Sequence, residues 1–289
     1  MLEPTSHAFQ ANGLTLVVHD WGGAGAPVLL AHPTGFHGRV WAPVADQLRA
    51  HDRHVYSFDF RGHGDSDAPD IDYSWHGFAD DVLAIAEHLG LGGDPDLLAA
   101  GHSKGAASLI LAEARSSDTF ARIWAYEPIL FASDVPLPRE DDFPLAINAR
   151  KRRNEWPSID AAYEAYAAKP PLDVMTEASL RAYVDYGFRD RGDGVFELKC
   201  APEVEARVYS MGPNHGGYGE LPSVEAPVLV VCGETSRDIS PEFGARIAER
   251  LSQGALEVMA GCGHFGPQQD PDATVASMLR FATATAPAG

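Results

Sequence analysis

The segment LLAAGHSKGAAS, residues 97–108, places a serine hydroxyl between two glycines where an apolar run meets a run of small residues. Gly101, Ser103 and Gly105 form the pattern Gly-x-Ser-x-Gly, which between a strand and a helix is typical of a nucleophile elbow. Glycine is expected at both flanks because a Cβ atom there would collide with the neighbouring strand or helix. The positive end of the helix dipole favours negative charge that develops beside the hydroxyl. The pattern therefore predicts that Ser103 is a nucleophile rather than part of an ordinary glycine-rich turn.

A serine nucleophile needs a general base, because a free hydroxyl attacks poorly near neutral pH. His264 lies in the sequence GCGHFG, a glycine-flanked loop that follows an apolar run. A histidine in such a loop can turn its imidazole into a crevice. We therefore expect His264 to take the proton of Ser103.

The strand and helix patterns place these residues in an alternating α/β order. The segment HAFQANGLTLVVHDWG reads as a β-hairpin with its turn at Asn12-Gly13, and APVLLAHP reads as a strand buried on both faces. Strands then alternate with helices up to about residue 129 and again from residue 225, which predicts a doubly wound, mostly parallel sheet. Helix starts are expected at Ser74, Ser240 and Asp270.

Residues 130–224 interrupt this alternation. They carry helical patches joined by Pro- and Gly-rich pieces and no strong strand signal. We therefore predict a core domain from residues 1–129 and 225–289, with a helical cap or lid inserted as residues 130–224. The basic cluster Arg150 to Arg153 is expected to form one exposed helix face.

Five motifs in this order resemble those of the α/β-hydrolase family, over nearly the whole chain. They are AHPTGFHGRVW (similar to the oxyanion loop), FDFRGHGDSD (similar to a structural turn, here with Asp59 and Arg61), GHSKG (the elbow), VLVVCGE (similar to the strand end that carries the acid) and GCGHFGPQQDP (similar to the strand end that carries the histidine). The resemblance implies a cofactor-free hydrolase with a Ser-His-acid triad, in which His264 is the general base. It also implies that the insertion covers the active site.

The oxyanion hole implied by the resemblance consists of two backbone N–H groups. They belong to Lys104, which follows the nucleophile, and to Thr34, two residues after His32. Pro33 stands where the family usually has glycine, and proline cannot donate. Because the donor position is Thr34, the hole is expected to be complete. For His32 itself we expect a hydrogen-bonded packing role.

The acid of the triad has more than one candidate. Members of the family commonly carry an aspartate three residues after the glycine that ends this strand, here Gly233, and that position holds Ser236. Asp238 lies two residues later and is the preferred interpretation. Glu127, at the end of the strand RIWAYE, is the alternative, since some members carry their acid there; Glu234 is a weaker third choice. The acid would orient the histidine tautomer and stabilise the imidazolium.

Lys104 raises a separate question, because the family usually has an apolar residue or glutamine beside the nucleophile. An unpaired buried charge is costly. We therefore expect a carboxylate partner, either Glu127 or an acidic group of the substrate, with a solvent-facing lysine as the alternative.

Composition narrows the class of function. The chain has 289 residues and a formal net charge of −19, which disfavours binding to nucleic acid or to an anionic membrane. There is no apolar run long enough to span a bilayer and no secretory pattern at the start, so a cytoplasmic protein is expected. The three cysteines lack metal-ligand spacing, and no cofactor or metal is predicted. Cys232, in an apolar run, reads as a buried free thiol.

The sequence thus predicts a serine hydrolase that cleaves an ester, lactone or related acyl bond of a small molecule. Serine in place of a carboxylate nucleophile argues against dehalogenation and epoxide opening. Carbon–carbon bond hydrolysis and perhydrolysis use the same triad and remain open alternatives. A non-catalytic small-molecule receptor on the same fold is a further alternative.

Overall fold

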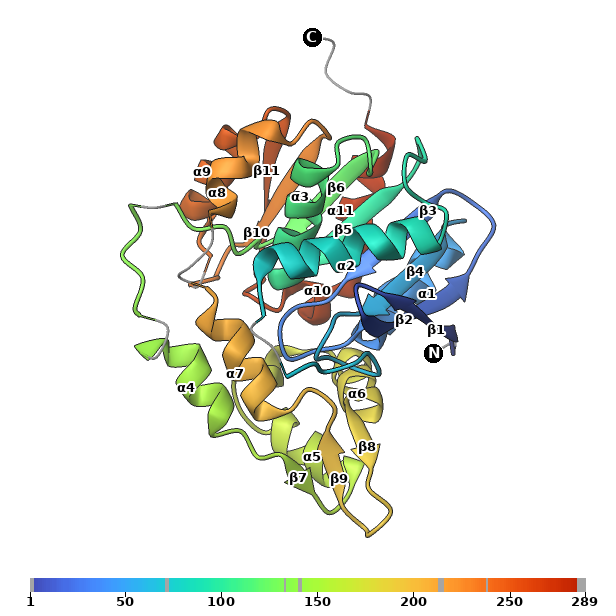
Figure 1. Ribbon diagram of the computed structural model, residues 1–289, viewed down its shortest axis with the longest axis vertical. Coiled ribbons are helices and arrows are strands. Elements are labelled where there is room, and N and C mark those ends of the chain that lie inside the picture. The colour runs from blue at the N-terminus through green and yellow to red at the C-terminus, as the bar shows by residue number, and fades with distance from the viewer. Residues whose placement is uncertain are drawn as a thin grey trace.

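An eight-stranded sheet forms the centre of the computed structural model, which describes residues 3–70, 73–132, 134–139, 142–212, 216–237 and 239–284 (Figure 1). The strand order is β1–β2–β4–β3–β5–β6–β10–β11. The strands are β1 (Thr5–Ala11), β2 (Leu14–Gly22), β3 (Pro27–Ala31), β4 (His54–Asp59), β5 (Leu98–His102), β6 (Arg122–Tyr126), β10 (Val228–Gly233) and β11 (Gly254–Met259).

The sheet is parallel from β4 to β11, as the alternation of strands and helices predicts. The predicted hairpin is confirmed at the other edge, where β1 pairs antiparallel with β2 and β2 pairs antiparallel with β4. Its turn residues Asn12 and Gly13 have φ angles of 53° and 75°. Asparagine and glycine tolerate this left-handed conformation, which explains the Asn-Gly turn.

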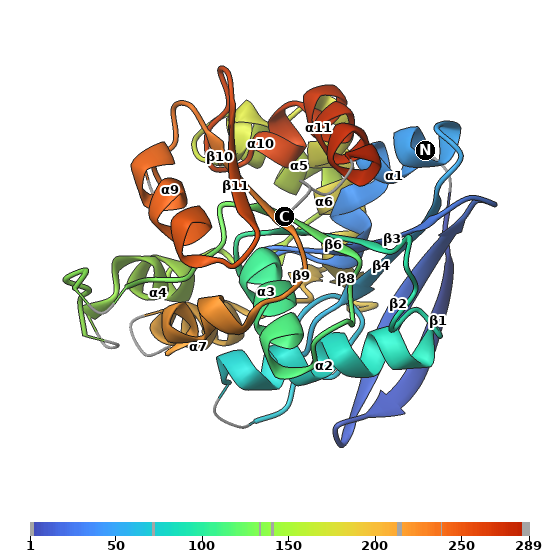
Figure 2. The ribbon, with the colours of Figure 1, turned by 90° about the horizontal axis from the view of Figure 1, so that it is seen from above.

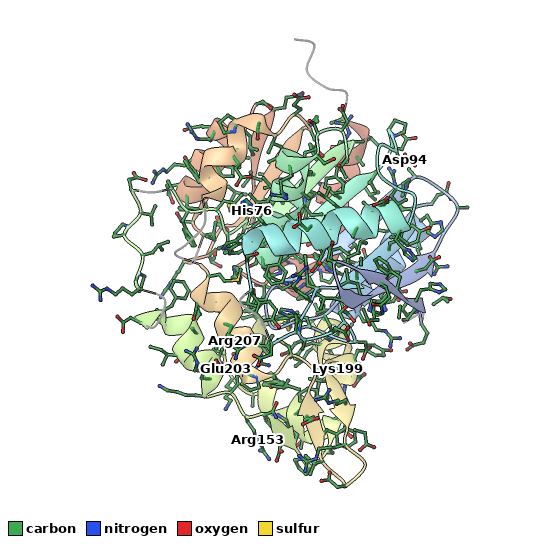
Figure 3. All side chains as sticks on the ribbon, viewed as in Figure 1. His76, Asp94, Arg153, Lys199, Glu203 and Arg207 are labelled. Atoms are coloured by element: carbon green, nitrogen blue, oxygen red, sulfur yellow. The ribbon has the colours of Figure 1, made fainter. Side chains whose placement is uncertain are left out.

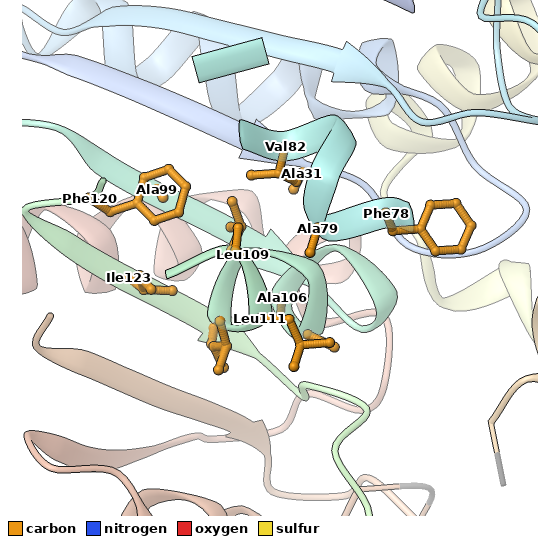
Figure 4. Packing of buried hydrophobic residues seen from close by; sticks show 14 of the residues in the cluster. Ala31, Phe78, Ala79, Val82, Ala99, Ala106, Leu109, Leu111, Phe120 and Ile123 are labelled. Carbon is orange, nitrogen blue, oxygen red and sulfur yellow. The ribbon is translucent and has the colours of Figure 1, made fainter. Parts of the chain in front are cut away.

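Helices cover both faces of the sheet, as Figure 2 shows from above. On one face α2 (Trp75–His88), α3 (Lys104–Arg115) and α9 (Pro241–Arg250) share a buried apolar cluster with the sheet; Figure 4 shows Phe78, Ala79, Val82 and Leu109 within it. On the other face α1 (Ala42–Ala50) and α11 (Pro271–Thr283) bury a second cluster, and the short helix α10 (Gly266–Gln269) precedes α11. Because helices lie on both faces, β3 and β10 are buried at every residue.

The predicted helix starts are confirmed by their caps. The side chains of Ser74, Ser240 and Asp270 accept hydrogen bonds from the backbone N–H groups of Gly77, Phe243 and Ala273. Each cap satisfies an N–H group that the first turn of a helix leaves without a carbonyl partner.

Between β6 and β10 the chain leaves the large sheet, and Figure 1 shows most of this part gathered at one end of it, whereas α8 (Gly217–Glu220) lies beside α9. We call residues 130–224 the inserted segment. Its helices are α4 (Pro144–Arg150), α5 (Ile159–Ala167), α6 (Glu177–Gly187), α7 (Pro202–Ser210) and α8, with short 3-10 helices at Leu172–Val174 and Leu221–Ser223. A 3-10 helix at Gly38–Trp41 precedes α1 in the core.

The inserted segment also holds a three-stranded sheet, β7–β9–β8, which sequence analysis missed. Its strands are β7 (Glu155–Trp156), β8 (Phe188–Asp190) and β9 (Phe196–Leu198). The inserted segment therefore contains the expected helices together with strands that the sequence did not indicate. Strands of two or three residues are too short to show an alternating pattern in the sequence.

Candidate active site

The elbow has the strained geometry that its glycines imply. Ser103 joins β5 to α3 with φ 55° and ψ −116°, a conformation rare for residues other than glycine. A Cβ on Gly101 would lie 2.6 Å from the backbone nitrogen of Ala106, and a Cβ on Gly105 would lie 2.8 Å from the carbonyl oxygen of His32. Real Cβ contacts are never this short. The helix can therefore approach the sheet closely only because both positions are glycine.

The backbone donors predicted for the oxyanion hole lie where two chain segments meet at the elbow. Lys104 is the first residue of α3, so no carbonyl inside the helix accepts from its N–H. Thr34 is buried in the loop after β3, and that loop packs against the start of α3 through the close approach of His32 to Gly105.

His32 holds this loop in place. Its Nδ1 lies 2.7 Å from the carbonyl oxygen of Pro33, and its Nε2 accepts a hydrogen bond from the Phe60 N–H at 3.1 Å. Burial lowers the pKa of His32 well below its ordinary value, so the ring is neutral and can both donate and accept. These contacts agree with the packing role expected for His32.

His264 lies in the loop between β11 and α10, and three contacts fix this loop. The Tyr126 hydroxyl donates to the carbonyl oxygen of Gly263 at 2.6 Å, and the Gly263 N–H donates to Gln269 Oε1 at 3.0 Å. A Cβ on Gly233 would lie 2.6 Å from the Gly263 carbonyl oxygen, so the end of β10 also packs against the loop.

Glu127, directly after β6, is the carboxylate in contact with His264. His264 Nδ1 lies 2.6 Å from Glu127 Oε2, and Ser236 Oγ donates to the same oxygen at 2.9 Å. The Gly233 N–H donates to Oε1 at 2.9 Å. Glu127 is fully buried, with a φ of 45° that turns its side chain under the end of β10. This geometry suits a carboxylate that orients an imidazole.

The other two candidates for the acid are Asp238 and Glu234. Asp238, the preferred interpretation of the sequence, lies outside the described residues. Glu234 Oε2 accepts from the Gly261 N–H at 2.8 Å, so this carboxylate braces the histidine loop from outside.

Ser103 and His264 lie at the same edge of the sheet, Ser103 directly after β5 and His264 in the loop after β11. The ring of His102, which precedes the nucleophile, lies 4.9 Å from the His264 ring, centroid to centroid. In the described part of the chain no hydrogen bond joins the Ser103 hydroxyl to this imidazole. Such contacts are often long in enzymes without substrate.

The Lys104 side chain does not pair with Glu127, so that expectation is wrong. Nor does it face solvent, because only 1% of the residue is exposed. Its Nζ lies 3.6 Å from the centre of the Phe60 ring and 4.5 Å from that of Phe78, with no hydrogen-bond partner among the described residues. Burial lowers the pKa of the amine well below its ordinary value. The side chain turns away from the surface into the core, which also argues against contact with a substrate carboxylate.

Arg152 corrects the expectation that the cluster Arg150 to Arg153 forms one exposed face. α4 ends at Arg150, and the Arg152 guanidinium turns inward, donating to Glu205 Oε2 at 2.6 Å and to the Tyr183 hydroxyl. A Cβ on Gly35 would lie 2.8 Å from the Glu205 carboxyl carbon. The pair therefore packs against the loop that carries Thr34. Glu205 is 53 residues from Arg152, which is why sequence spacing gave no signal.

The cysteines, possible metal ligands and possible membrane spans complete the description. Cys200, Cys232 and Cys262 are free and buried, as predicted for Cys232. Among the described residues there is no group of three or more His, Cys, Asp or Glu that could hold a metal ion. In the same part of the chain, no helix is long and apolar enough to cross a membrane.

Known proteins resemble this chain in sequence and in fold. The model of the alpha/beta hydrolase family matches residues 28–277. N-formylmaleamate deformylase of Pseudomonas putida is 34% identical over 94% of both chains, and 2-(acetamidomethylene)succinate hydrolase of Mesorhizobium japonicum is 26% identical over 93% of this chain and 91% of that protein. The crystal structure of an E-2-(acetamidomethylene)succinate hydrolase superposes with a TM-score of 0.84 at 23% identity, covering 97% of this chain and all of the other. A bifunctional esterase/perhydrolase of Acinetobacter calcoaceticus is 26% identical over 93% of this chain and 96% of its own. The chain belongs to the alpha/beta hydrolase family.

Proposed function

We propose that this protein is a serine hydrolase that cleaves an ester, lactone or related acyl bond of a small molecule, with Ser103 as nucleophile, His264 as general base and Glu127 as the acid. The observation that carries the proposal is the 2.6 Å contact between His264 Nδ1 and a fully buried Glu127 carboxylate, beside a serine in a strained elbow. We propose Glu127 rather than Asp238, the acid preferred from the sequence, because the Glu127 contact with His264 lies among the described residues.

The proposed reaction has two steps. Ser103 attacks the acyl carbon while His264 Nε2 takes its proton, and Glu127 stabilises the imidazolium through Nδ1. The backbone N–H groups of Lys104 and Thr34 hold the oxyanion, and His264 then gives the proton to the leaving group. Water activated by His264 releases the acyl group in the second step. Loss of one oxyanion donor typically costs about 2.7–4 kcal/mol of transition-state stabilisation.

We further propose that the inserted segment covers the site and selects the substrate. Two ion pairs support its placement over the core: Lys199 Nζ lies 2.7 Å from Asp65, and Arg207 lies 2.9 Å from Asp70 (Lys199 and Arg207 are labelled in Figure 3). The Arg152–Glu205 pair adds a buried contact with the loop of Thr34.

A second candidate is hydrolysis of an N-acyl bond in a small carboxylic acid. It is favoured by two relatives whose names give N-formylmaleamate and 2-(acetamidomethylene)succinate as substrates. The same nucleophile, base and oxyanion donors would serve an amide carbonyl, which makes this a narrower form of the first proposal.

A fluorophosphonate probe followed by peptide mapping tests the nucleophile. We expect labelling at Ser103 in the wild type and none in Ser103→Ala or His264→Ala. A small activated ester, assayed in parallel, covers the case in which the inserted segment excludes the probe. Folded protein that neither reacts nor hydrolyses the ester would contradict the proposal and favour the receptor alternative.

Rates on a matched set of substrates then separate the acyl classes. A simple ester, a lactone, an N-formyl acid, an N-acetyl acid and a vinylogous diketone are compared by kcat/KM. A preference for the N-acyl acids supports the second candidate, a preference for the ester or lactone supports the first, and a preference for the diketone overturns both in favour of carbon–carbon bond hydrolysis.

A further inference from the structure

We propose that Ser236 is a positioning residue, which fixes the plane of the Glu127 carboxylate so that Oε2 points at His264. This inference rests on the proposed function, because it concerns how the acid of that triad is held. It assigns a task to the residue found where the sequence suggested an acid.

Three donors from two segments, the end of β10 with its following turn and the histidine loop, hold the Glu127 carboxylate. The Gly233 N–H holds Oε1 at 2.9 Å, whereas His264 Nδ1 and the Ser236 hydroxyl both contact Oε2, at 2.6 and 2.9 Å. Without Ser236, His264 Nδ1 would be the one remaining hydrogen-bond partner of Oε2 among the described residues. The Ser236 hydroxyl is the contact that holds Oε2 independently of the histidine.

Ser236 is itself held by a turn that is attached to the histidine loop. Its N–H donates to the Gly233 carbonyl oxygen at 3.1 Å, and the preceding Thr235 donates to the Cys262 carbonyl oxygen through both its N–H and its hydroxyl, each at 2.9 Å. Ser236 is 8% exposed. The turn therefore fixes the acid and the histidine loop relative to each other.

The same geometry makes residue 236 a second position from which a carboxylate can reach His264. Ser236 Oγ and His264 Nδ1 meet at a single oxygen atom of Glu127. An aspartate side chain at 236 extends one atom beyond the serine hydroxyl, into the space that Glu127 Oε2 would leave in a Glu127→Ala variant.

The first experiment compares Ser236→Ala with Thr235→Val on the ester that the wild type hydrolyses. Both variants remove one hydroxyl hydrogen bond of 2.9 Å from the same turn, but only Ser236 contacts the acid. In Thr235→Val the backbone N–H of residue 235 still donates to the Cys262 carbonyl oxygen, so the turn stays attached to the histidine loop. We expect kcat to fall about tenfold to a hundredfold in Ser236→Ala, the usual effect of losing a hydrogen bond to a charged group. KM should hardly change, Thr235→Val should stay within about threefold of the wild type, and Ser236→Thr should restore kcat.

A spectroscopic readout separates positioning from general loss of structure. The low-field proton NMR signal of the His264 Nδ1–H bound to Glu127 should weaken or shift in Ser236→Ala and persist in Thr235→Val. Equal kcat values and equal NMR signals in the two variants would overturn the inference.

The second experiment moves the acid. Glu127→Ala/Ser236→Asp should be at least about tenfold more active than Glu127→Ala alone, since a misplaced triad acid can cost about 10⁴ in rate. Circular dichroism checks that the double variant folds. If it folds and is no more active than Glu127→Ala, a carboxylate at position 236 does not reach His264, and this part of the inference is wrong. Ser103→Ala is assayed beside all variants: if it keeps full activity, the proposed function fails, whereas the other outcomes concern Ser236 alone.

Discussion

Glu127 and Lys104 lie at the same end of neighbouring strands and are almost completely buried. They differ in their surroundings, which are polar around Glu127 and aromatic around Lys104. Glu127 follows β6 and receives three hydrogen bonds, one of them from His264. Lys104 follows Ser103 at the start of α3 and places its amine over two phenylalanine rings, and in the part of the chain that the structure describes the amine has no hydrogen-bond partner. Burial without hydrogen-bond partners favours the neutral form of an amine. The comparison supports the proposal that Glu127 acts through its side chain, whereas Lys104 acts through its backbone N–H.

The strongest test of this difference is Glu127→Gln. We expect kcat to fall about 10⁴-fold, because an amide no longer stabilises the imidazolium or selects its tautomer. Glu113→Gln is the matched control: Glu113 is also fully buried and accepts backbone N–H bonds from Asp118 and Phe120, but on the outer part of α3. Steady-state kinetics on the ester should show activity close to wild type in this control, and equal losses in the two variants would break the comparison.

Lys104→Met should leave activity within about threefold of the wild type and raise stability. Methionine keeps a long apolar stem and removes an unpartnered buried amine, which typically costs about 1–3 kcal/mol. Urea unfolding at pH 7 measures the gain. A large loss of kcat without loss of folding would show that the amine itself takes part in the chemistry.

The stability gain of Lys104→Met should depend on pH. Burial lowers the pKa of Lys104 in the folded protein below its ordinary value of 10.5, so between the two pKa values the unfolded chain binds more protons. Raising the pH through this window stabilises the wild type, by at most about 1.4 kcal/mol per pH unit, while the variant gains nothing from this group. The difference in unfolding free energy should therefore shrink from pH 7 to pH 10. A difference that is constant or grows would mean that the folded amine stays charged.

The smallest expected effect is the coupling free energy between Lys104 and Glu127. If Lys104 and Glu127 do not interact, the changes in activity and stability should add in Glu127→Gln/Lys104→Met to within about 0.5 kcal/mol. A double-mutant cycle measures this quantity. A coupling above about 1 kcal/mol would restore the ion pair first expected from the sequence.

Features that depend on local spacing were predictable. The Asn-Gly hairpin, the caps at Ser74 and Asp270 and the two elbow glycines each follow from residues within a few positions of one another. The order of these elements along the chain then determines the parallel sheet, because each strand is returned to the sheet by a helix.

Features that depend on distant partners were harder to predict. Glu127 was a candidate for the acid, but its contact with Ser236 joins residues 109 positions apart in the sequence. No sequence pattern indicates its positive φ. The inward turn of Arg152 depends on Glu205, which lies on another helix of the inserted segment. The direction of the Lys104 side chain depends on how α3 approaches Phe60, since a helix start permits several directions for a long side chain.

The strained backbone at Ser103 has a consequence for how such a chain changes over generations. A positive φ at a residue other than glycine costs about 1–3 kcal/mol, so a glycine at this position would relax the elbow while removing the nucleophile. Variants selected for thermal stability alone would thus be drawn toward an inactive, more robust protein. Under the proposed function, selection for turnover would keep serine at this turn.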